Sequence, residues 1–318
     1  MDVIEMGSGT TRSFKIVRTK VMQELQPRQK SLDNFLPQKS YETELKTLFQ
    51  KHLAQLNNRD TEQIRKHLDT IKTSLEKDLD RPLELNYGGS LAKNTYANGI
   101  SDIDMLVILN ATELAGKSPK YVMKYFKKRL INRLPESEIT IGKLAVTVKF
   151  KSTGNEIQLL PALKTKDGYQ ISTENGKHWS NVIKPYKFAK KLIAVNKAQG
   201  STVLPIIKMF KEFNSALSPN SRLKGYHIES LAIEAFKNYE GTKNTKDMLK
   251  HFVKFASNAL KHQIDDVSGQ SDYVDGYLGN LHSFKRRKVG LALKNLSDKI
   301  QRADDEGSIE KWKDIIGD

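Results

Sequence analysis

The stretch GGSLAKNTYANGISDIDMLVIL, Gly88–Leu109, decides how this sequence is interpreted. It opens with two glycines and a serine, and it ends with Asp102 and Asp104 running into an apolar segment. The apolar segment predicts a short buried strand at Met105–Leu109. Residues i and i+2 of a strand point to the same side. The two carboxylates are therefore expected to project together at the start of that strand.

Two carboxylates held side by side repel each other unless a cation lies between them. Hard oxygen ligands of this kind suit Mg²⁺ or Mn²⁺, and two such ions bind a triphosphate and activate a hydroxyl. The preceding Gly88-Gly89-Ser90 turn fits the same purpose, because glycine lets backbone amides approach phosphate and the serine hydroxyl adds a hydrogen bond. An ordinary polar turn is the alternative. The combination of turn, aspartate pair and strand favours a metal-dependent phosphate site.

Upstream and downstream of this stretch the chain mixes helices and strands. Apolar residues recur at helical spacing from Tyr41 to Leu79, with a break near Asn57-Asn58. Ser118 and Pro119 are typical of a helix start. The expected elements here are two helices within 41–79, a strand at Leu83–Tyr87, a helix at Pro119–Leu134, and a hairpin of Ala145–Lys151 with Glu156–Leu160.

Strands are expected largely to stop after Pro161, and helical patterns dominate from Pro185 to Ile316. The clearest helical runs are Leu204–Phe213, Ile228–Phe236, Met248–Leu260 and Phe284–Ala303. The fold class is therefore α+β, with a mixed sheet followed by a helical half. We expect a basic N-terminal arm at 1–35, a core with its N-terminal helices at 36–165, and a helical lobe at 166–318.

The composition narrows the classes of function. The 318 residues carry a formal charge of +16, which favours a polyanionic partner such as nucleotides or nucleic acid, although a basic surface also serves solubility. The absence of cysteine excludes disulfides, thiolate metal sites and a cysteine nucleophile. No apolar run is long enough to span a bilayer and no secretory leader is visible, so we expect a cytoplasmic protein without a membrane partner. The basic helix at Lys120–Leu134 predicts only weak nucleic-acid binding.

The Gly88–Leu109 stretch resembles the GS-x-D-x-D signature of the polymerase-β-like nucleotidyltransferases. The resemblance implies that Gly89 and Ser90 contact the phosphates of a donor nucleotide. It also implies that Asp102 and Asp104 are the catalytic ligands of two Mg²⁺ (or Mn²⁺) ions.

Later blocks narrow the resemblance. LPIIKMFKEFN (Leu204–Asn214) and LKGYHIESLA (Leu223–Ala232) are similar to the helical half of cyclic GMP–AMP synthase-like and oligoadenylate synthase-like enzymes, and most of all to bacterial cyclic-oligonucleotide synthases of anti-phage signalling. Ile264–Gly279 and Lys311–Asp318 extend the similarity. It implies a polymerase-β-like core with a C-terminal helical lobe. It also implies synthesis of a cyclic di- or trinucleotide from NTPs, which switches on a separate effector protein.

The resemblance assigns roles to further residues. Lys208 and Lys211 lie three apart on one helix, and one of the two is expected to contact donor phosphate. Tyr226 stands where related enzymes carry an aromatic residue that stacks on a nucleobase, a contact worth about 1–3 kcal/mol. His227 and Glu229 follow it and are interpreted as a structural pair, because two-metal transfer needs neither.

Four acidic residues and one tryptophan are expected to have structural roles. Trp179 is interpreted as a packing anchor between the two halves. The aspartates in the loop-rich stretch before the last helices are attributed to helix capping; they are Asp265, Asp266, Asp272 and Asp275.

The third carboxylate of the superfamily is replaced in this sequence. The resemblance to the signalling enzymes implies a metal-binding carboxylate three residues before a proline. In this sequence, within EIQLLPALK, that position is Gln158. Glutamine is uncharged and cannot accept a proton from a hydroxyl at neutral pH. Glu156, two residues earlier on the same strand face, is the candidate substitute. Two other functions therefore stay open: a template-independent transferase that extends a linear nucleic acid or tags a macromolecule, and a degenerate nucleotide-binding sensor.

Overall fold

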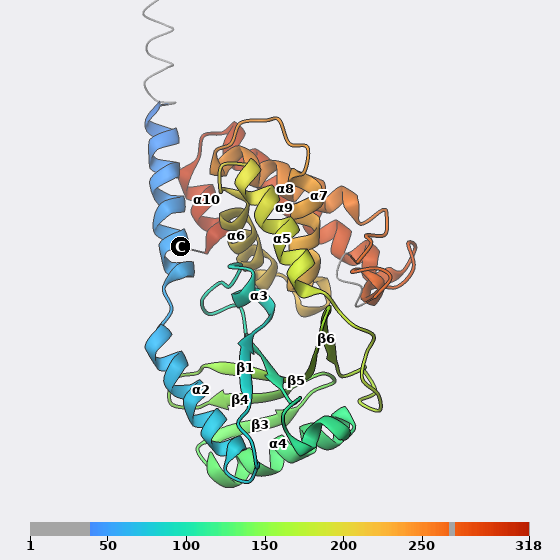
Figure 1. The fold of residues 1–318 in the computed structure, drawn as a ribbon. Coiled ribbons are helices and arrows are strands. Elements are labelled where there is room, and N and C mark those ends of the chain that lie inside the picture. Colours follow the sequence, from blue (N-terminus) through green and yellow to red (C-terminus); the bar gives the residue numbers. More distant parts are fainter. Residues whose placement is uncertain (1–38, 267–270, 318) are drawn as a thin grey trace, which may run out of the picture.

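The computed structural model describes residues 39–266 and 271–317, so the basic arm expected at 1–35 lies outside the described residues. The chain forms a sheet lobe and a helical lobe that lie one above the other (Figure 1). This arrangement confirms the expected α+β class. No helix in the described ranges is long and apolar enough to cross a membrane.

In the described ranges, the sheet lobe is built on six strands. Of these, β2 and β5 form the one parallel pair, so the sheet is mixed, as expected. The strand order is β1-β2-β5-β4-β3, with β6 pairing β5 beyond the end of β4. The strands are β1 (Glu84–Tyr87), β2 (Ile103–Ile108), β3 (Ser137–Ile141), β4 (Val146–Phe150), β5 (Glu156–Thr165) and β6 (Gly168–Ile171).

Two helices cover one face of this sheet, α2 (Thr61–Glu76) and α4 (Pro119–Arg133). Their apolar residues share one core with β2, β3, β4 and β5. The helix start at Ser118 is confirmed, since its hydroxyl accepts a hydrogen bond from the Tyr121 N–H and Pro119 begins the first turn.

The expectation that strands largely stop after Pro161 places the end of the sheet too early, since β5 continues to Thr165 and β6 follows at Gly168–Ile171 before the helical half begins. Pro161 lies inside β5, opposite Val107 of β2. On the other edge, β4 pairs only with Glu156–Leu159 and β6 only with Ala162–Thr165, so the proline falls in the gap between two partners. A proline there removes no ladder hydrogen bond. The short strands β3 and β6 were also missed.

The helical lobe contains a helix over residues 39–57 and the helices of the second half. The first helix packs its Leu45, Leu48 and Phe49 into the core of this lobe rather than onto the sheet. The domain boundaries at 35/36 and 165/166 stay a prediction. The other helices are α5 (Pro185–Ala198), α6 (Val203–Ala216), α7 (Gly225–Phe236), α8 (Thr245–Ala259), α9 (Phe284–Asp305) and α10 (Ile309–Ile316).

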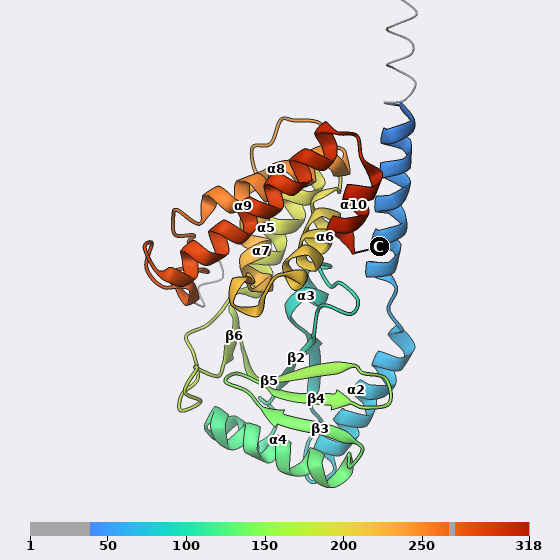
Figure 2. The ribbon, with the colours of Figure 1, turned by 180° about the vertical axis from the view of Figure 1, so that it is seen from behind.

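The first and last described helices touch in that core. The Phe49 ring meets the Trp312 ring edge-on at 5.2 Å between centroids, and the Trp312 indole N–H donates to the Tyr41 hydroxyl at 2.9 Å. Residues 39–57 therefore lie beside α10, as both ribbon views show (Figures 1 and 2).

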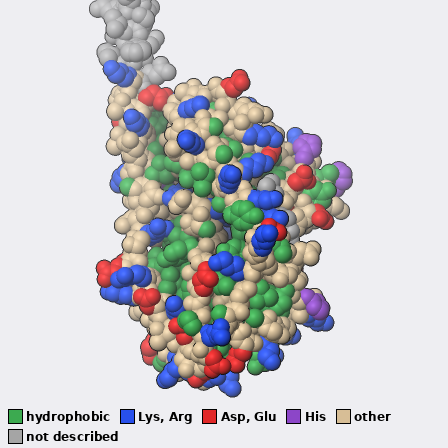
Figure 3. Space-filling model, in the orientation of Figure 1, with side chains coloured by type: hydrophobic (Ala, Val, Ile, Leu, Met, Phe, Trp, Pro, Cys, Tyr) green, Lys and Arg blue, Asp and Glu red, His purple; other side chains and the backbone are tan. Residues whose placement is uncertain are grey.

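The basic surface is spread over the molecule. Figure 3 shows Lys and Arg side chains over both lobes with Asp and Glu between them. On α4, Arg129 and Arg133 both pair with Asp78, at 2.8 and 2.6 Å, which neutralises part of that helix.

Candidate active site

Asp104 is the second residue of β2 and Asp102 directly precedes that strand, which lies between β1 and β5. Both aspartates open into a cavity of about 390 Å³ between the lobes. The strand position is held by the ladder with β1, in which the Gly88 N–H donates to the Asp104 carbonyl at 2.8 Å. The sheet lobe contributes Gly89, Ser90, Lys93, Ile100, Ser101, Asp102, Asp104 and Gln158 to the wall; the helical lobe contributes Lys211, Asn214, Ser215, Arg222, Leu223, Gly225, Tyr226, Ile228 and Glu229.

The pKa values of both carboxyl groups are raised, so their ionised forms are destabilised in the folded protein. Burial and the charge of Asp102 raise the pKa of Asp104 to about 6. Burial and the charge of Glu156 raise the pKa of Asp102 as well. A divalent cation between the two would remove this penalty, so the pair is suited to bind one.

Gln158 faces the aspartates, as the strand alignment predicts. It is paired with Asp104 in the parallel ladder, and its amide Nε2 donates to Asp102 Oδ2 at 2.7 Å. Glu156 is close enough to act on the charge of Asp102, but it does not line the cavity. Within the described ranges, no group of three or more acidic or histidine side chains is arranged to hold a metal. The site therefore offers two carboxylates and one amide.

The Gly89 turn is shaped around Asp104. Gly89 has φ +46°, and a β-carbon built on it would lie 1.6 Å from Asp104 Oδ2. The short helix α3 (Gly89–Ala92) starts at this turn and carries Ser90. The Ser90 hydroxyl is buried on the cavity wall and has no hydrogen-bond partner among the described residues. A buried hydroxyl without a partner fits a phosphate oxygen as its missing ligand.

We expect Gly89→Ala to lower activity by at least about 100-fold, because the new methyl group must displace the Asp104 carboxylate by an ångström or more. The positive φ adds backbone strain. Steady-state kinetics and thermal melting check this. Gly88→Ala is the matched control, since a β-carbon there meets Asp104 at an ordinary 3.6 Å and φ is −110°. Equal losses in the two variants would contradict the explanation.

A buried ionic cluster forms the floor beneath these groups; we call Lys93, Thr95, Lys211 and Glu229 the Glu229 cluster. Lys93 Nζ lies 2.6 Å from Glu229 Oε2, and Lys211 Nζ donates to Glu229 Oε1 at 3.0 Å and to the Thr95 carbonyl at 2.9 Å. Thr95 Oγ1 donates to Glu229 as well. The cluster joins the loop after Ser90 to α6 and α7, and so links the two lobes.

The electrostatics of the Glu229 cluster favour an anion in the cavity. Burial opposes the charge of Glu229, which is 1% exposed, but Lys93 and Lys211 outweigh it and hold its pKa below the ordinary value. Burial lowers the pKa of Lys211. Two lysines against one glutamate leave a surplus positive charge beside Asp104, where a polyphosphate would be stabilised.

Lys208 is not brought to the cavity. Its Nζ donates to Asn57 Oδ1 at 2.5 Å, on the side of the helix over residues 39–57, and burial lowers its pKa. Lys93 instead supplies a cation close to Ser90. The signal for it was present in the sequence, three residues after the serine in the GS stretch.

Tyr226 does line the cavity. Its ring packs on Phe188 at 4.6 Å between centroids, Lys93 Nζ lies 5.3 Å from the ring, and its hydroxyl donates to Asp266 at 2.6 Å. The Asp266 contact shows that capping was the wrong explanation for that residue. The ring is only half-buried, so part of it stays available at the cavity wall.

His227 and Glu229 do not form the expected pair. They follow each other at i and i+2 on α7 and point to different partners, since His227 Nδ1 meets the Tyr277 hydroxyl at 3.1 Å. Burial lowers the pKa of His227 to about 4, so the ring is neutral.

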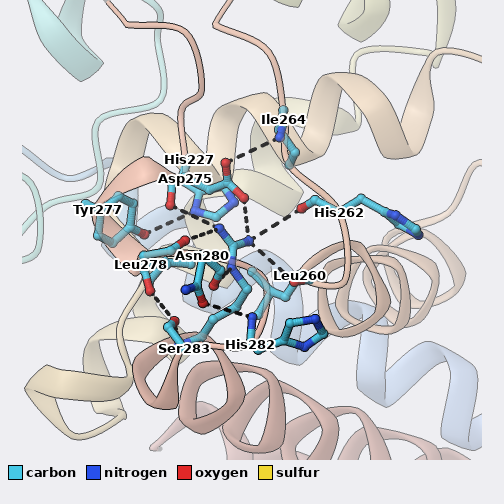
Figure 4. A network of polar contacts seen from close by, with 12 residues as sticks. His227, Leu260, His262, Ile264, Asp275, Tyr277, Leu278, Asn280, His282 and Ser283 are labelled. Carbon is cyan, nitrogen blue, oxygen red and sulfur yellow. Dashed lines mark hydrogen bonds and ion pairs between the residues drawn. The ribbon is translucent and has the colours of Figure 1, made fainter.

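Two more interpretations are corrected. Asp275 is buried and paired with Arg286 at 2.5 Å, with no side-chain cap bond (Figure 4). Trp179 packs against the core of the sheet lobe, and its indole donates to the Lys117 carbonyl at 3.2 Å, so it does not bridge the halves. Ion pairing and lobe-internal packing depend on tertiary contacts that sequence spacing does not show.

Comparisons with known proteins identify the family and the fold of the chain. Residues 38–196, half of the chain, match the SMODS family, the Second Messenger Oligonucleotide or Dinucleotide Synthetase domain. A cyclic AMP-AMP-AMP synthase of Escherichia coli (strain MS 115-1) is 24% identical over 185 residues, which span 55% of this chain and 57% of that synthase.

Solved structures share the fold. E. coli MS115-1 CdnC with ATP superposes with a TM-score of 0.61 at 18% identity, covering 81% of this chain and 92% of that one. E. coli DncV in its 3′-deoxy GTP bound form gives 0.63 at 10% identity, covering 98% and 92%. At such identities the likeness concerns the fold, with a polymerase-β-like core and a helical lobe.

Proposed function

Because this chain belongs to the family of second messenger oligonucleotide or dinucleotide synthetases, we propose that it is a metal-dependent nucleotidyltransferase that makes a cyclic di- or trinucleotide from NTPs. The proposal depends on three features that line one cavity. These are two carboxyl groups with raised pKa, a buried serine hydroxyl without a hydrogen-bond partner among the described residues, and the positive charge of two lysines. The name of the E. coli relative makes ATP the first substrate to test.

The residues fit Mg²⁺ or Mn²⁺, with Asp102 and Asp104 as the ligands. Bound there, the metal would supply the Lewis acidity that activates an attacking hydroxyl. The chain's own residues hold the donor nucleotide. Gly89 and Ser90 bind its phosphates, and Tyr226 stacks on its base.

The charges of two lysines stabilise the pyrophosphate leaving group. Lys211 and Lys93 lie next to the carboxylates and offset the negative charge of the triphosphate. A ribose hydroxyl of the acceptor loses its proton to solvent water and its oxygen forms the new bond to the α-phosphorus. The bond from the α-phosphorus to the bridging oxygen breaks, and pyrophosphate leaves with that electron pair. A second such transfer within the linear product closes the ring.

The proposed setting is a cytoplasmic anti-phage response in which the product switches on a separate effector protein. Incubation with each labelled NTP and with all four, in Mg²⁺ or Mn²⁺, followed by phosphatase treatment and mass spectrometry, tests the activity. We expect small phosphatase-resistant species. A lengthening linear polymer would instead support the template-independent transferase.

The sensor stays the second candidate because of one contact. The Gln158 amide donates to Asp102 Oδ2 and occupies a lone pair that a metal would use. Nucleotide binding without pyrophosphate release under every metal condition would favour this reading over the enzyme.

The variant Gln158→Asp tests, through metal binding, whether the protein is an active enzyme or a sensor. The new carboxylate adds repulsion beside Asp102, so the metal-free variant should melt at a lower temperature than the wild type, and Mn²⁺ should then raise its melting temperature by more. Thermal melting over a Mn²⁺ titration measures both effects. An unchanged Mn²⁺ response would show that position 158 does not contact the metal.

Glu156→Gln tests the substitute acid. If Glu156 serves as the third carboxylate, the variant should lose activity nearly as completely as a variant of Asp104, and Mg²⁺-dependent NTP binding should weaken. Unchanged turnover would remove Glu156 from the site and leave a two-carboxylate centre.

A further inference from the structure

A second hollow lies between α8 and α9, on the helical lobe. It has a volume of about 630 Å³ and shares no lining residue with the active-site cavity. Figure 2 shows α9 on the outside of the helical lobe, away from the sheet. We call this hollow the α8–α9 groove. Its charged and apolar lining residues are Lys254, Lys261, Leu281, Arg286, Arg287, Leu291, Lys294 and Asp298.

Two exposed leucines line this groove, Leu291 at 60% and Leu281 at 41% exposure. Phe284 lies outside the lining, on the same helix as Leu291, and is 75% exposed, the highest value for a large hydrophobic residue in the described parts of the chain. Phe284 and Leu291 lie seven residues, about two helical turns, apart on α9, so Phe284 extends the exposed apolar surface of the groove toward the start of that helix. A single exposed leucine needs no explanation, but a cluster at a hollow is typical of an interaction surface.

Positive charge surrounds the apolar cluster. The side chains of Lys254, Lys261 and Arg287 have no hydrogen-bond or ion-pair partner within residues 39–266 and 271–317. Lys294 pairs with Asp298 at 2.7 Å, and both are exposed. The groove therefore has a surplus of unpaired cations around exposed hydrophobic groups, which complements an acidic ligand with apolar anchors.

We propose that the α8–α9 groove docks a regulatory protein through an acidic segment that carries leucine-like side chains at helical spacing. An amphipathic helix laid in a groove satisfies both features at once, with apolar anchors over Leu281 and Leu291 and carboxylates toward the cations. Nucleic acid fits less well, because phosphates would meet the cations while the apolar side chains stayed in water.

The groove connects physically to the active site. Arg286 lines it, but the guanidinium is buried and donates to Asp275 Oδ2 at 2.5 Å and to the Gly279 carbonyl at 3.0 Å (Figure 4). Tyr277, between these residues, accepts a hydrogen bond from the Lys224 N–H at 3.0 Å. Lys224 is the N-cap of α7, the helix that carries Tyr226 and Glu229. An occupant of the groove thus contacts the loop that supports the base-stacking helix.

Fluorescence anisotropy with a labelled acidic peptide of about 15 residues tests the proposal. Leucine recurs in the probe at i, i+3 and i+4, and glutamate fills the other positions. We expect the full-length protein to bind it at least about tenfold more tightly than a peptide with serine in place of leucine, which corresponds to about 1.4 kcal/mol. Leu291→Ser with Arg287→Glu should reduce binding of the leucine peptide by at least about tenfold.

Lys124→Glu, at an exposed lysine on α4, changes the net charge by the same amount as Arg287→Glu; it is the matched control for charge and should leave binding unchanged. Equal affinity for the two peptides, equal losses in the two variants, or no binding up to about 1 mM peptide would each overturn the proposal. So would tighter binding of a DNA or RNA duplex that is lost in the Arg287 variant, since the groove would then be a nucleic-acid site. Unchanged melting temperatures confirm that both variants are folded.

Discussion

Replacing Asp102 and Asp104 together with asparagine is expected to lower nucleotidyl transfer by at least about 10³-fold and to raise the thermal stability of the metal-free protein. The activity falls because an amide binds a hard divalent cation far more weakly than a carboxylate. Stability rises because burial and the neighbouring carboxylate hold the pKa of Asp104 at about 6, well above its ordinary value, so ionisation at neutral pH destabilises the fold.

The raised pKa of Asp104 also determines how the stability gain of the variant depends on pH. A carboxyl group whose pKa is raised on folding destabilises the folded state above that pKa and stops doing so as the pH falls through it. The melting-temperature difference between variant and wild type should therefore be largest near pH 7 and shrink by pH 5. Because the pKa of Asp104 rises from 3.8 to about 6, its ionisation at neutral pH costs about 3 kcal/mol of stability.

Calorimetry without metal at both pH values, together with pyrophosphate release, measures these effects. Asp69→Asn with Asp80→Asn removes two exposed charges from the same lobe and is the matched control. A double variant of Asp102 and Asp104 that keeps full activity would end the two-metal proposal. One that melts below the wild type at pH 7 would contradict the electrostatic account.

Arg286→Met is expected to destabilise the protein by about 3–5 kcal/mol, the largest stability effect that we predict. Asp275 is 0% exposed and Arg286 2%, so the variant leaves a carboxylate buried without its counter-charge. The Gly279 and Asn280 carbonyls lose their donor as well. The melting temperature should fall by roughly 10 °C.

Two further variants identify the cause of that loss. Arg287→Met, at the next position but exposed, should change stability by no more than about 0.5 kcal/mol. Asp275→Asn added to Arg286→Met should recover part of the loss, because it removes the unpaired charge. No recovery in the double variant would show that the carbonyl contacts, not the ion pair, carry the stability.

The sequence predicts the parts of the site that are local. Gly89, Ser90 and the aspartate pair fall within one short stretch, where a turn and a strand fix their relation. The Glu229 cluster escaped prediction because Glu229 lies on α7, far along the chain from Lys93 and Thr95. The pairing of His227 with Glu229 was wrong for a related reason, since neighbours in sequence found different partners in space.

For the fold too, local features were predicted from the sequence and features that depend on tertiary contacts were not. Periodicity identified the helices and the hairpin, and the α+β class followed from their order. It failed at Pro161, where the tolerance for proline depends on which strands flank β5 on its far edge. The assignment of Trp179 failed because its packing partners belong to the sheet core.

The contact between residues 39–57 and α10 has a consequence for synthesis on the ribosome. Trp312 is fully buried against Phe49, so the apolar side of the first described helix receives its last cover only when α10 emerges. At ~5–20 residues per second, that wait is on the order of tens of seconds. During this interval Leu45, Leu48 and Phe49 leave an apolar surface on the nascent chain that α10 does not yet cover. The helix over residues 39–57 is therefore the part of the lobe most exposed to unwanted association before synthesis ends.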